Sequence, residues 1–310
     1  MYFDEQRIKS SLRPLFPLAA NSCSALQEYL AYYRLDVLPG SIASGYFDVA
    51  GYRLVGHVFS APGAAQGTVL LQHGYYDHVG LYGHIIRHCL EQGFNVFCYD
   101  LPGHGLSTGE RAAIDSFDEY HAVFEAGLAL CQQHLPGPLV VIGQSTGGAI
   151  ILDYLLRQQI TAANNPFAAI HLLAPLVRPT GWTGAVIMYV LLHKFIPRLR
   201  RGFTDNSNNA AFLRFVSEAD PLQPLYLQTN WVGALREWIK QIEARPALHV
   251  PLHIIQGDAD ETVDFRHNLP LLQQKFADVK IDMIKGGRHH LANEDASRLA
   301  LVKQYLTPLL

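Results

Sequence analysis

The sequence predicts an α/β fold in which helices cover both faces of a mostly parallel sheet and a cap is inserted late in the chain. From residue 68 onward, short apolar runs of strand length alternate with longer segments of helical periodicity, which is typical of a parallel sheet. Between residues 176 and 226 this alternation stops, and it resumes afterwards. The chain of 310 residues, 49% of them hydrophobic, is long enough to bury the core of such a fold.

The predicted elements divide the chain into four parts. Residues 1–43 are an N-terminal extension with a short amphipathic helix at 24–33, and a hairpin with strands at 46–49 and 52–59 follows. Residues 44–175 are the first part of the core, 176–226 the cap or lid, and 227–310 the second part of the core. Further strands are expected at 68–71, 94–99, 139–142, 169–173, 252–255 and 279–284, and further helices at 81–92, 117–134, 149–158, 231–244, 269–276 and 295–306.

Composition argues against several classes of protein. The formal net charge of −3 lacks the basic excess of a nucleic-acid-binding protein. There is no run of about 18 apolar residues that would predict a membrane-spanning helix, and residues 1–13 are too polar for a secretory signal. The cysteines have no metal-type spacing and favour free thiols in a reducing cytoplasm; they are Cys23, Cys89, Cys98 and Cys131. We therefore expect a cytoplasmic protein that binds no nucleic acid.

A strand, a sharp turn and a helix surround Ser145. The apolar run at 139–142 leads into Gly143-Gln144-Ser145-Thr146-Gly147, and a helical pattern follows. In that context G-x-S-x-G is typical of a nucleophile elbow, because the flanking glycines leave room for a strained turn that lifts the serine hydroxyl above the sheet. The turn also directs the backbone N–H of Thr146 toward the reacting oxygen. A bare glycine turn is the alternative, but the context predicts Ser145 as a nucleophile.

A nucleophilic serine needs a base, and the base needs an acid that orients it, so both should follow later strands. The strand at 252–255 leads to Asp258 and Asp260, and the strand at 279–284 leads to His289 and His290. The residues alone leave open which member of each pair acts. A solvated turn is a further interpretation of the carboxylates.

The loop after the strand at 68–71 contains His73-Gly74. A histidine–glycine pair in this loop typically supplies the second donor of an oxyanion hole, which predicts that the backbone N–H of Tyr75 acts together with that of Thr146. His84 and His88 lie four residues apart on a predicted helix, but no H-E-x-x-H pattern or further ligand accompanies them. We therefore expect neither a metal nor an organic cofactor.

Together these motifs resemble the monoacylglycerol lipase and lysophospholipase-like branch of the α/β-hydrolase superfamily. The resemblance spans residues 44–308 and implies an α/β-hydrolase fold and a serine hydrolase that cleaves esters of monoacyl lipids through an acyl-enzyme on Ser145. The family's spacing selects Asp260 as the acid and His289 as the base. The family usually has histidine at the position of Gln144. The resemblance rests on residues 73–74, 99–109, 143–148, 220–222, 257–264 and 286–294.

Other functions remain compatible with these residues. A peptidase, a thioesterase, a carbon–carbon hydrolase or a small-ester carboxylesterase would use the same triad. A ligand-binding protein that retains the fold without turnover is an alternative from another class, although the complete set of Ser145, Asp260 and His289 argues against it. The substrate is therefore expected to be a small ester or a monoacyl lipid.

The predicted cap begins with a run of large apolar residues. Trp182, Met188 and Tyr189 within it are expected to contact an acyl chain, since the run follows a core strand where a cap would cover the active site. Clustered basic residues come next, an order that suits a segment lying at an anionic membrane surface, although the net charge of −3 argues against membrane contact. The alternative is that the apolar run packs the cap onto the core and the basic residues form a solvated face. The basic residues are Lys194, Arg198, Arg200 and Arg201.

Overall fold

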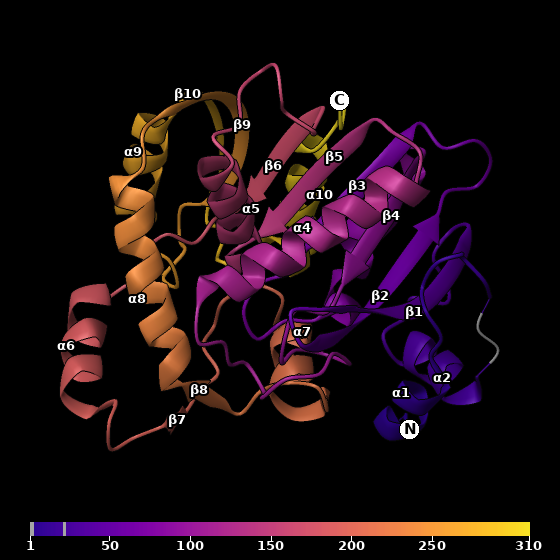
Figure 1. The fold of residues 1–310 in the computed structure, drawn as a ribbon, viewed down its shortest axis with the longest axis horizontal. Helices are drawn as coiled ribbons and strands as arrows, with labels where there is room; N and C mark the ends of the chain where they lie inside the picture. The colour runs from indigo at the N-terminus through magenta and orange to yellow at the C-terminus, as the bar shows by residue number, and fades with distance from the viewer. Residues whose placement is uncertain (1–2, 21–22) are drawn as a thin grey trace.

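The computed structural model describes residues 3–20 and 23–310, and Figure 1 shows a central sheet between layers of helices. Within these residues, eight strands form one sheet in the order β1-β2-β4-β3-β5-β6-β9-β10. β1 and β2 are antiparallel to their neighbours, and the remaining pairs are parallel. The predicted α/β fold with a mostly parallel sheet is thus confirmed. The strands of this sheet are β1 (Ser41–Val49), β2 (Tyr52–Ser60), β3 (Gly67–Gln72), β4 (Phe94–Tyr99), β5 (Leu139–Gln144), β6 (Ala169–Leu173), β9 (Leu248–Gly257) and β10 (Phe276–Ile284).

Helices cover both faces of the sheet, and each face has its own apolar core. α4 and α5 cross one face in Figure 1, and α10 lies behind the sheet. The residues of α4, α5 and α8 belong to one buried cluster, whereas those of α2, α3 and α10 belong to the other. The helices outside the cap are α1 (Glu5–Ser11), α2 (Ser24–Tyr32), α3 (Gly83–Glu91), α4 (Phe117–His134), α5 (Thr146–Arg157), α8 (Thr229–Ala244), α9 (Phe265–Lys275) and α10 (Ala296–Tyr305), with 3-10 turns η1 (Val79–Tyr82) and η3 (Leu291–Asn293).

The central strands β3 and β5 are buried along their whole length, which explains their continuous apolar runs. From β3 the chain passes to β4 on one side and then returns to β5 on the other side. The loops that follow β3 and β5 therefore leave the sheet in opposite directions. A crevice at the carboxyl ends of such strands is where open α/β sheets bind ligands.

α5 begins three residues earlier than the sequence predicts, at Thr146 instead of residue 149. Gly147 and Gly148 hide this start, since glycine is a poor helix former. Packing explains both glycines. A Cβ on Gly147 would lie 2.3 Å from the Gln72 carbonyl oxygen, and one on Gly148 would lie 3.1 Å from the Pro175 side chain. The close approach of helix and sheet requires these residues at the first turn of α5.

The segment between β6 and α8 departs from the βα alternation, as the sequence indicates. It contains α6 (Trp182–Leu192), β7 (Arg198–Arg200), α7 (Ala210–Arg214), the π-helical turn η2 (Phe215–Ala219) and β8 (Tyr226–Gln228). β7 and β8 form a separate antiparallel pair. α6 lies beside α8 at the outer edge of the molecule in Figure 1. We call residues 176–226 the cap segment below.

Candidate active site

Ser145 lies on a strained turn between β5 and α5. Its backbone has φ +53° and ψ −114°, a conformation that residues with a side chain rarely adopt. The flanking glycines make this turn sterically feasible, because a Cβ on Gly143 would lie 2.6 Å from the backbone of Gly147. The side chain is 8% exposed and stands at the N-terminus of α5, where the helix dipole favours negative charge. The geometry is that of the predicted elbow.

His289 connects Ser145 to Asp260. The Nε2 atom of His289 lies 2.9 Å from the Oγ atom of Ser145, and its Nδ1 atom lies 2.8 Å from the Oδ2 atom of Asp260. The alternatives that the residues left open lie elsewhere. The Nε2 atom of His290 lies 3.2 Å from Asp77, and Asp258 is an exposed residue that accepts the N–H of residue 286. The structure therefore brings together the set that the family spacing selects.

The electrostatics of this pair favour an ionised acid and a basic imidazole. Burial alone would raise the pKa of Asp260, but His289 and the backbone N–H of Val263 hold it below its ordinary value. Burial alone would lower the pKa of His289, but the Asp260 carboxylate outweighs this and raises it. The raised pKa makes His289 a stronger proton acceptor than a buried imidazole without a carboxylate partner.

The predicted oxyanion donors belong to the loop after β3 and to the first turn of α5. A Cβ on Gly74 would lie 3.3 Å from the Cβ of Ser145, so the loop after β3 runs directly against the elbow. Thr146 is the first residue of α5 and its backbone N–H is unpaired within the helix. The Tyr75 ring stacks on Trp231 with centroids 3.8 Å apart, and its hydroxyl donates to the carbonyl of residue 112. These contacts hold the Tyr75 backbone in place beside the nucleophile.

Two glutamines support the triad, and sequence reasoning assigned a role to neither. Gln144 donates from its Nε2 atom to the carbonyl oxygen of His289 at 2.9 Å. Gln256 donates to Asp260 Oδ2 at 3.0 Å. The departure of Gln144 from the usual family histidine was the one signal in the sequence that could have drawn attention to this side chain. Gln256 has no such signal, because it is one polar residue at the end of a buried strand.

A second hydrogen-bonded chain anchors the loop after β3. The backbone N–H of Gly74 donates to the Tyr82 hydroxyl at 3.0 Å, and that hydroxyl donates to Asp77 at 2.7 Å. The carboxylate of Asp77 also faces His290. Burial would raise the pKa of Asp77, but His290 and Tyr82 lower it, so the carboxylate is ionised. The chain fixes the glycine that precedes the predicted oxyanion donor Tyr75.

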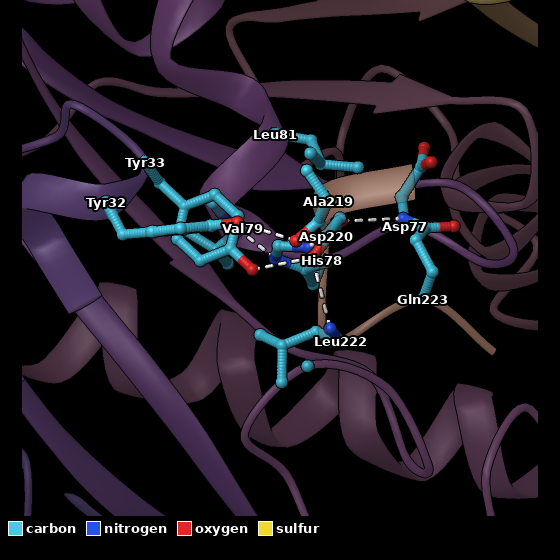
Figure 2. A network of polar contacts seen from close by, with 12 residues as sticks. Tyr32, Tyr33, Asp77, His78, Val79, Leu81, Ala219, Asp220, Leu222 and Gln223 are labelled. Atoms are coloured by element: carbon cyan, nitrogen blue, oxygen red, sulfur yellow. Dashed lines mark hydrogen bonds and ion pairs between the residues drawn. The ribbon is translucent and has the colours of Figure 1, made fainter. Parts of the chain in front are cut away.

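A further buried histidine–carboxylate pair joins three distant segments (Figure 2). The Nε2 atom of His78, in the loop after β3, lies 2.9 Å from Asp220 of the cap segment. The Tyr33 hydroxyl donates to the other oxygen of Asp220 at 2.6 Å, and the Tyr32 hydroxyl donates to the Ala219 carbonyl at 2.6 Å. The N-terminal segment, the core loop and the cap segment therefore meet at one network.

The cap residues predicted to contact substrate lie on α6. Met188 and Tyr189 line an apolar cavity of about 150 Å³ between α6 and the elements around β7, β8 and α8. Trp182 is partly buried against the main core. Ser145 is not among the residues that line this cavity. Contact of the three residues with an acyl chain stays a prediction.

Neither a metal cluster nor a membrane span is found in the described part of the chain. No three His, Cys, Asp or Glu side chains there are placed to hold a metal ion. His84 is exposed, and the His88 ring lies 3.1 Å from the hydroxyl of Thr307. No helix within residues 3–20 and 23–310 is long and apolar enough to cross a membrane.

The core of the chain matches a known family. Residues 63–296 fit the profile of the family described as serine aminopeptidase, S33. The chain belongs to this family. The match covers the elbow, the loop after β3 and the loops that carry Asp260 and His289. Family membership therefore extends to the whole constellation around Ser145.

Relatives of the chain include monoacylglycerol lipases. The chain is 27% identical over 265 residues to the monoacylglycerol lipase of Mycolicibacterium smegmatis, covering 82% of this chain and 91% of that protein. It is 28% identical over 246 residues to human monoglyceride lipase, covering 75% and 78%. A soluble variant of the Saccharomyces cerevisiae monoglyceride lipase, solved with a substrate analogue, shares the fold with a TM-score of 0.71 at 22% identity, covering 84% of this chain and 94% of that one. The predicted resemblance to monoacylglycerol lipases and the α/β-hydrolase fold are confirmed.

Proposed function

We propose that the protein is a serine hydrolase that cleaves carboxylic esters of monoacyl lipids, monoacylglycerols or lysophospholipids, with Ser145 as its nucleophile. The observation that carries this proposal is the hydrogen-bonded line from Asp260 through His289 to Ser145, with separations of 2.8 and 2.9 Å. The monoacylglycerol lipases among the relatives support the class of substrate.

Acylation follows from this geometry. As Ser145 Oγ attacks the ester carbonyl carbon, His289 Nε2 accepts the hydroxyl proton, and Asp260 stabilises the resulting imidazolium. The carbonyl oxygen gains negative charge, and the backbone N–H groups of Tyr75 and Thr146 donate to it. Each such donor is worth about 3 kcal/mol in the transition state. When the tetrahedral intermediate collapses, the C–O bond to the alcohol breaks, and His289 returns the proton to the departing oxygen.

Deacylation uses the same groups with water as the nucleophile. His289 accepts a proton from water as the water oxygen attacks the acyl carbon, and the ester bond to Ser145 Oγ breaks. The proton then passes from His289 to Ser145, which regenerates the enzyme and releases a carboxylic acid. The chain's own groups supply the nucleophile, the base and the oxyanion donors, so the proposed reaction includes no metal ion or organic cofactor.

A panel of acyl lengths tests the substrate class. For p-nitrophenyl esters from acetyl to palmitoyl, kcat/KM should rise with chain length until the acyl pocket is full, by about fourfold for each methylene buried at ~0.8 kcal/mol. Monoacylglycerols, lysophospholipids, acyl thioesters and aminoacyl amides complete the panel. A steady fall from acetyl onward would identify a small-ester carboxylesterase. Preferred cleavage of the amides would identify a peptidase.

The Ser145→Ala variant is the control for this panel. Loss of the nucleophile should reduce kcat by about a millionfold. The hydroxyl that this change removes bonds to His289, a residue that Asp260 still holds, so the variant should retain the melting temperature of the wild type. A Ser145→Ala enzyme that kept more than a trace of activity in a pure preparation would remove Ser145 from the mechanism.

We also propose that the cap segment contacts a lipid surface through α6. The structure describes α6 throughout, and none of its residues is buried. Ile187 and Leu191 are 56% and 63% exposed, and Phe195 just beyond the helix is 81% exposed. An exposed apolar patch of this kind marks an interaction site. Lys194 and Arg200 are exposed cations that suit anionic headgroups. Arg201, in contrast, packs over the Tyr76 ring.

Vesicle co-sedimentation tests this contact. The protein should sediment with vesicles of phosphatidylcholine and phosphatidylglycerol at low salt, and Ile187→Ser with Leu191→Ser should reduce the bound fraction severalfold. Val37→Ser is a matched control, since Val37 is an apolar residue of similar exposure outside the cap segment. Absence of binding by the wild type would end the membrane proposal and leave the acyl-chain panel unaffected.

A further inference from the structure

A cavity of about 390 Å³ lies where the N-terminal segment, α3 and the α7–η2 part of the cap segment meet. Its volume is within the range of small-molecule sites, about 300–1,000 Å³. Of the described residues that line it, none belongs to the Ser145 triad. One wall, from residues 32–38, precedes the residues 63–296 that match the family. One wall of the cavity is therefore supplied by residues outside the part of the chain that matches the family.

The deeper wall of the cavity is apolar and aromatic. Leu81 and Phe212 are buried there, and Phe215 of the cap segment contacts the rings of Tyr32 and Tyr33. Such a lining favours a hydrocarbon chain over a fully polar ligand.

Hydrogen bonds hold this lining in place (Figure 2). The Tyr33 hydroxyl donates to Asp220, and the Tyr32 hydroxyl donates to the Ala219 carbonyl, both at 2.6 Å. From the core, Asn293 donates to the Leu81 carbonyl at 2.7 Å. The wall is thus built before any ligand arrives, which reduces the entropic cost of binding.

Cations without carboxylate partners also line the cavity. Arg34 and Arg87 belong to its lining, and no ion pair to either of them occurs among residues 3–20 and 23–310. Burial lowers the pKa of His84, and the neighbouring cations Lys303, Arg87 and Arg34 lower it further. Arg34, Arg87 and Lys303 therefore place positive charge around the His84 ring, and positive charge attracts an anionic group.

Arg34 occupies the turn that ends α2, beside the cavity. Arg34 follows the end of α2 with φ +57°, a left-handed conformation that usually belongs to glycine or asparagine at this position of a helix. The N–H of Leu35 donates to the Leu30 carbonyl at 2.8 Å, so this conformation closes the end of the helix and fixes the point at which the Arg34 side chain leaves the backbone. Arg87 lies close by, since it donates to the carbonyl of Val37 at 3.0 Å.

We propose that this cavity binds a single-chain amphiphile that ends in an anion. The hydrocarbon chain lies against Leu81, Phe212 and Phe215. The carboxylate or phosphate end pairs with the guanidinium groups of Arg34 and Arg87, each of which can donate to two oxygens of such an anion. A long-chain carboxylate or a lysolipid phosphate would satisfy this chemistry. The site is separate from Ser145, and its occupation does not depend on hydrolysis.

Photo-cross-linking locates the ligand directly. A dodecanoate with a diazirine in its chain is irradiated with the Ser145→Ala variant, and the labelled peptides are mapped by mass spectrometry. Labels are expected on residues 32–38 and 212–215, and dodecanoate should compete for them at least tenfold better than dodecanol. Competition by dodecyl phosphate tests the second source, and the stronger competitor identifies the end group.

The double variant Arg34→Gln with Arg87→Gln should reduce labelling of these peptides at least tenfold, and labels near the triad should persist. Arg13→Gln with Arg266→Gln, at two exposed arginines outside the cavity and the cap segment, is the matched control and should label as the parent does. If the double variant fails to fold, Arg34→Gln alone serves in its place, because Arg34 is exposed and its substitution should leave the fold intact. This single variant should reduce labelling severalfold. Labels absent from both peptides, unchanged in the arginine variants, or equally displaced by dodecanol would overturn the proposal. The function of Ser145 is measured by turnover and is independent of this result.

Discussion

Two buried histidine–carboxylate pairs in this protein have almost the same length and different surroundings. His289 lies 2.8 Å from Asp260, and His78 lies 2.9 Å from Asp220. The second ring nitrogen of His289 faces the Ser145 hydroxyl at 2.9 Å. The second ring nitrogen of His78 accepts the backbone N–H of Gly80 at 3.2 Å.

The difference shows that the pair itself does not make a catalytic base. His78 is bonded at both nitrogens to groups that hold the structure, so it has no nitrogen left to accept a proton from a hydroxyl. His289 has one nitrogen oriented by Asp260 and the other directed at Ser145, whose backbone is held in a strained turn. What distinguishes the two regions is the third group, a serine at an elbow in one and a backbone amide in the other.

Asp260 and Asp220, the carboxylates of the two pairs, also differ in the groups that they hold together. Asp220 accepts from the Tyr33 hydroxyl, the Leu222 backbone and Gln223 in addition to His78, and thereby joins the cap segment to the N-terminal segment. Removing the charge of a buried carboxylate, or one of the groups that donate to it, leaves the remaining buried groups unsatisfied, which lowers stability. We expect substitutions in the Ser145 region to change rate and substitutions in the His78 region to change stability.

Asp260→Asn should give the largest effect in this comparison, a fall in kcat of about 10⁴-fold. The base must be neutral to accept a proton, so wild-type kcat/KM should rise with pH through a His289 pKa above its ordinary 6.5. Burial acts against the charged imidazole and Asp260 favours it. Without the carboxylate, burial dominates, the pKa falls, and the acidic limb of the pH–rate profile should move to lower pH.

Asp258→Asn is the control for this experiment. Asp258 is the exposed carboxylate that the residues alone could not distinguish from Asp260, and its substitution should leave the pH–rate profile in place. A pH–rate profile that moved equally in both variants, or an Asp260→Asn enzyme with near wild-type kcat, would remove Asp260 from the mechanism. The His289 pair would then be no more catalytic than the His78 pair.

Most of the fold could be predicted from the sequence because each element has a local signal. Apolar runs and helical periodicity locate the strands and helices of the core, and the ordered motifs place Ser145, Asp260 and His289 at the ends of particular strands. Their assembly into one site follows from the topology of a parallel sheet, in which strand ends meet at one edge. Their roles in turnover stay a prediction that Asp260→Asn tests.

The rest depends on contacts between distant residues, for which one sequence has no signal. The Tyr33 hydroxyl meets Asp220 from 187 positions away, and Gln144 meets His289 from 145 positions away. The cap segment lacks the βα alternation of the core, so its sequence does not indicate which of its apolar residues are buried and which are exposed. The structure leaves α6 without a buried residue, and its inner side packs mainly against α8. Long-range packing decides these features, not local propensity.

The smallest effect on rate is expected for Asp220→Asn, which removes the charge of the second pair and keeps its shape. The free energy of unfolding should fall by about 3 kcal/mol at pH 5, because His78 and the Tyr33 hydroxyl lose an ionised partner in a buried site. The acidic limb of kcat/KM should stay in place. Asp48→Asn is the control, since Asp48 pairs with Arg53 at the surface and its loss should not measurably change stability.

The pH dependence of this stability difference sharpens the test. Burial raises the pKa of Asp220, but His78, Tyr33 and Gln223 outweigh it and lower the folded-state pKa to about 2, against an ordinary 3.8. A depressed carboxyl pKa stabilises the folded state above the ordinary value, and this contribution is lost as pH falls toward the folded-state value. In denaturant titrations, the difference in unfolding free energy between wild type and Asp220→Asn should therefore be largest at pH 5 and should decrease below about pH 4. A difference in unfolding free energy that stayed constant to pH 3 would contradict the lowered pKa of Asp220. An Asp220→Asn enzyme whose rate profile moved while its stability did not would mean that the His78 pair acts in catalysis like the His289 pair.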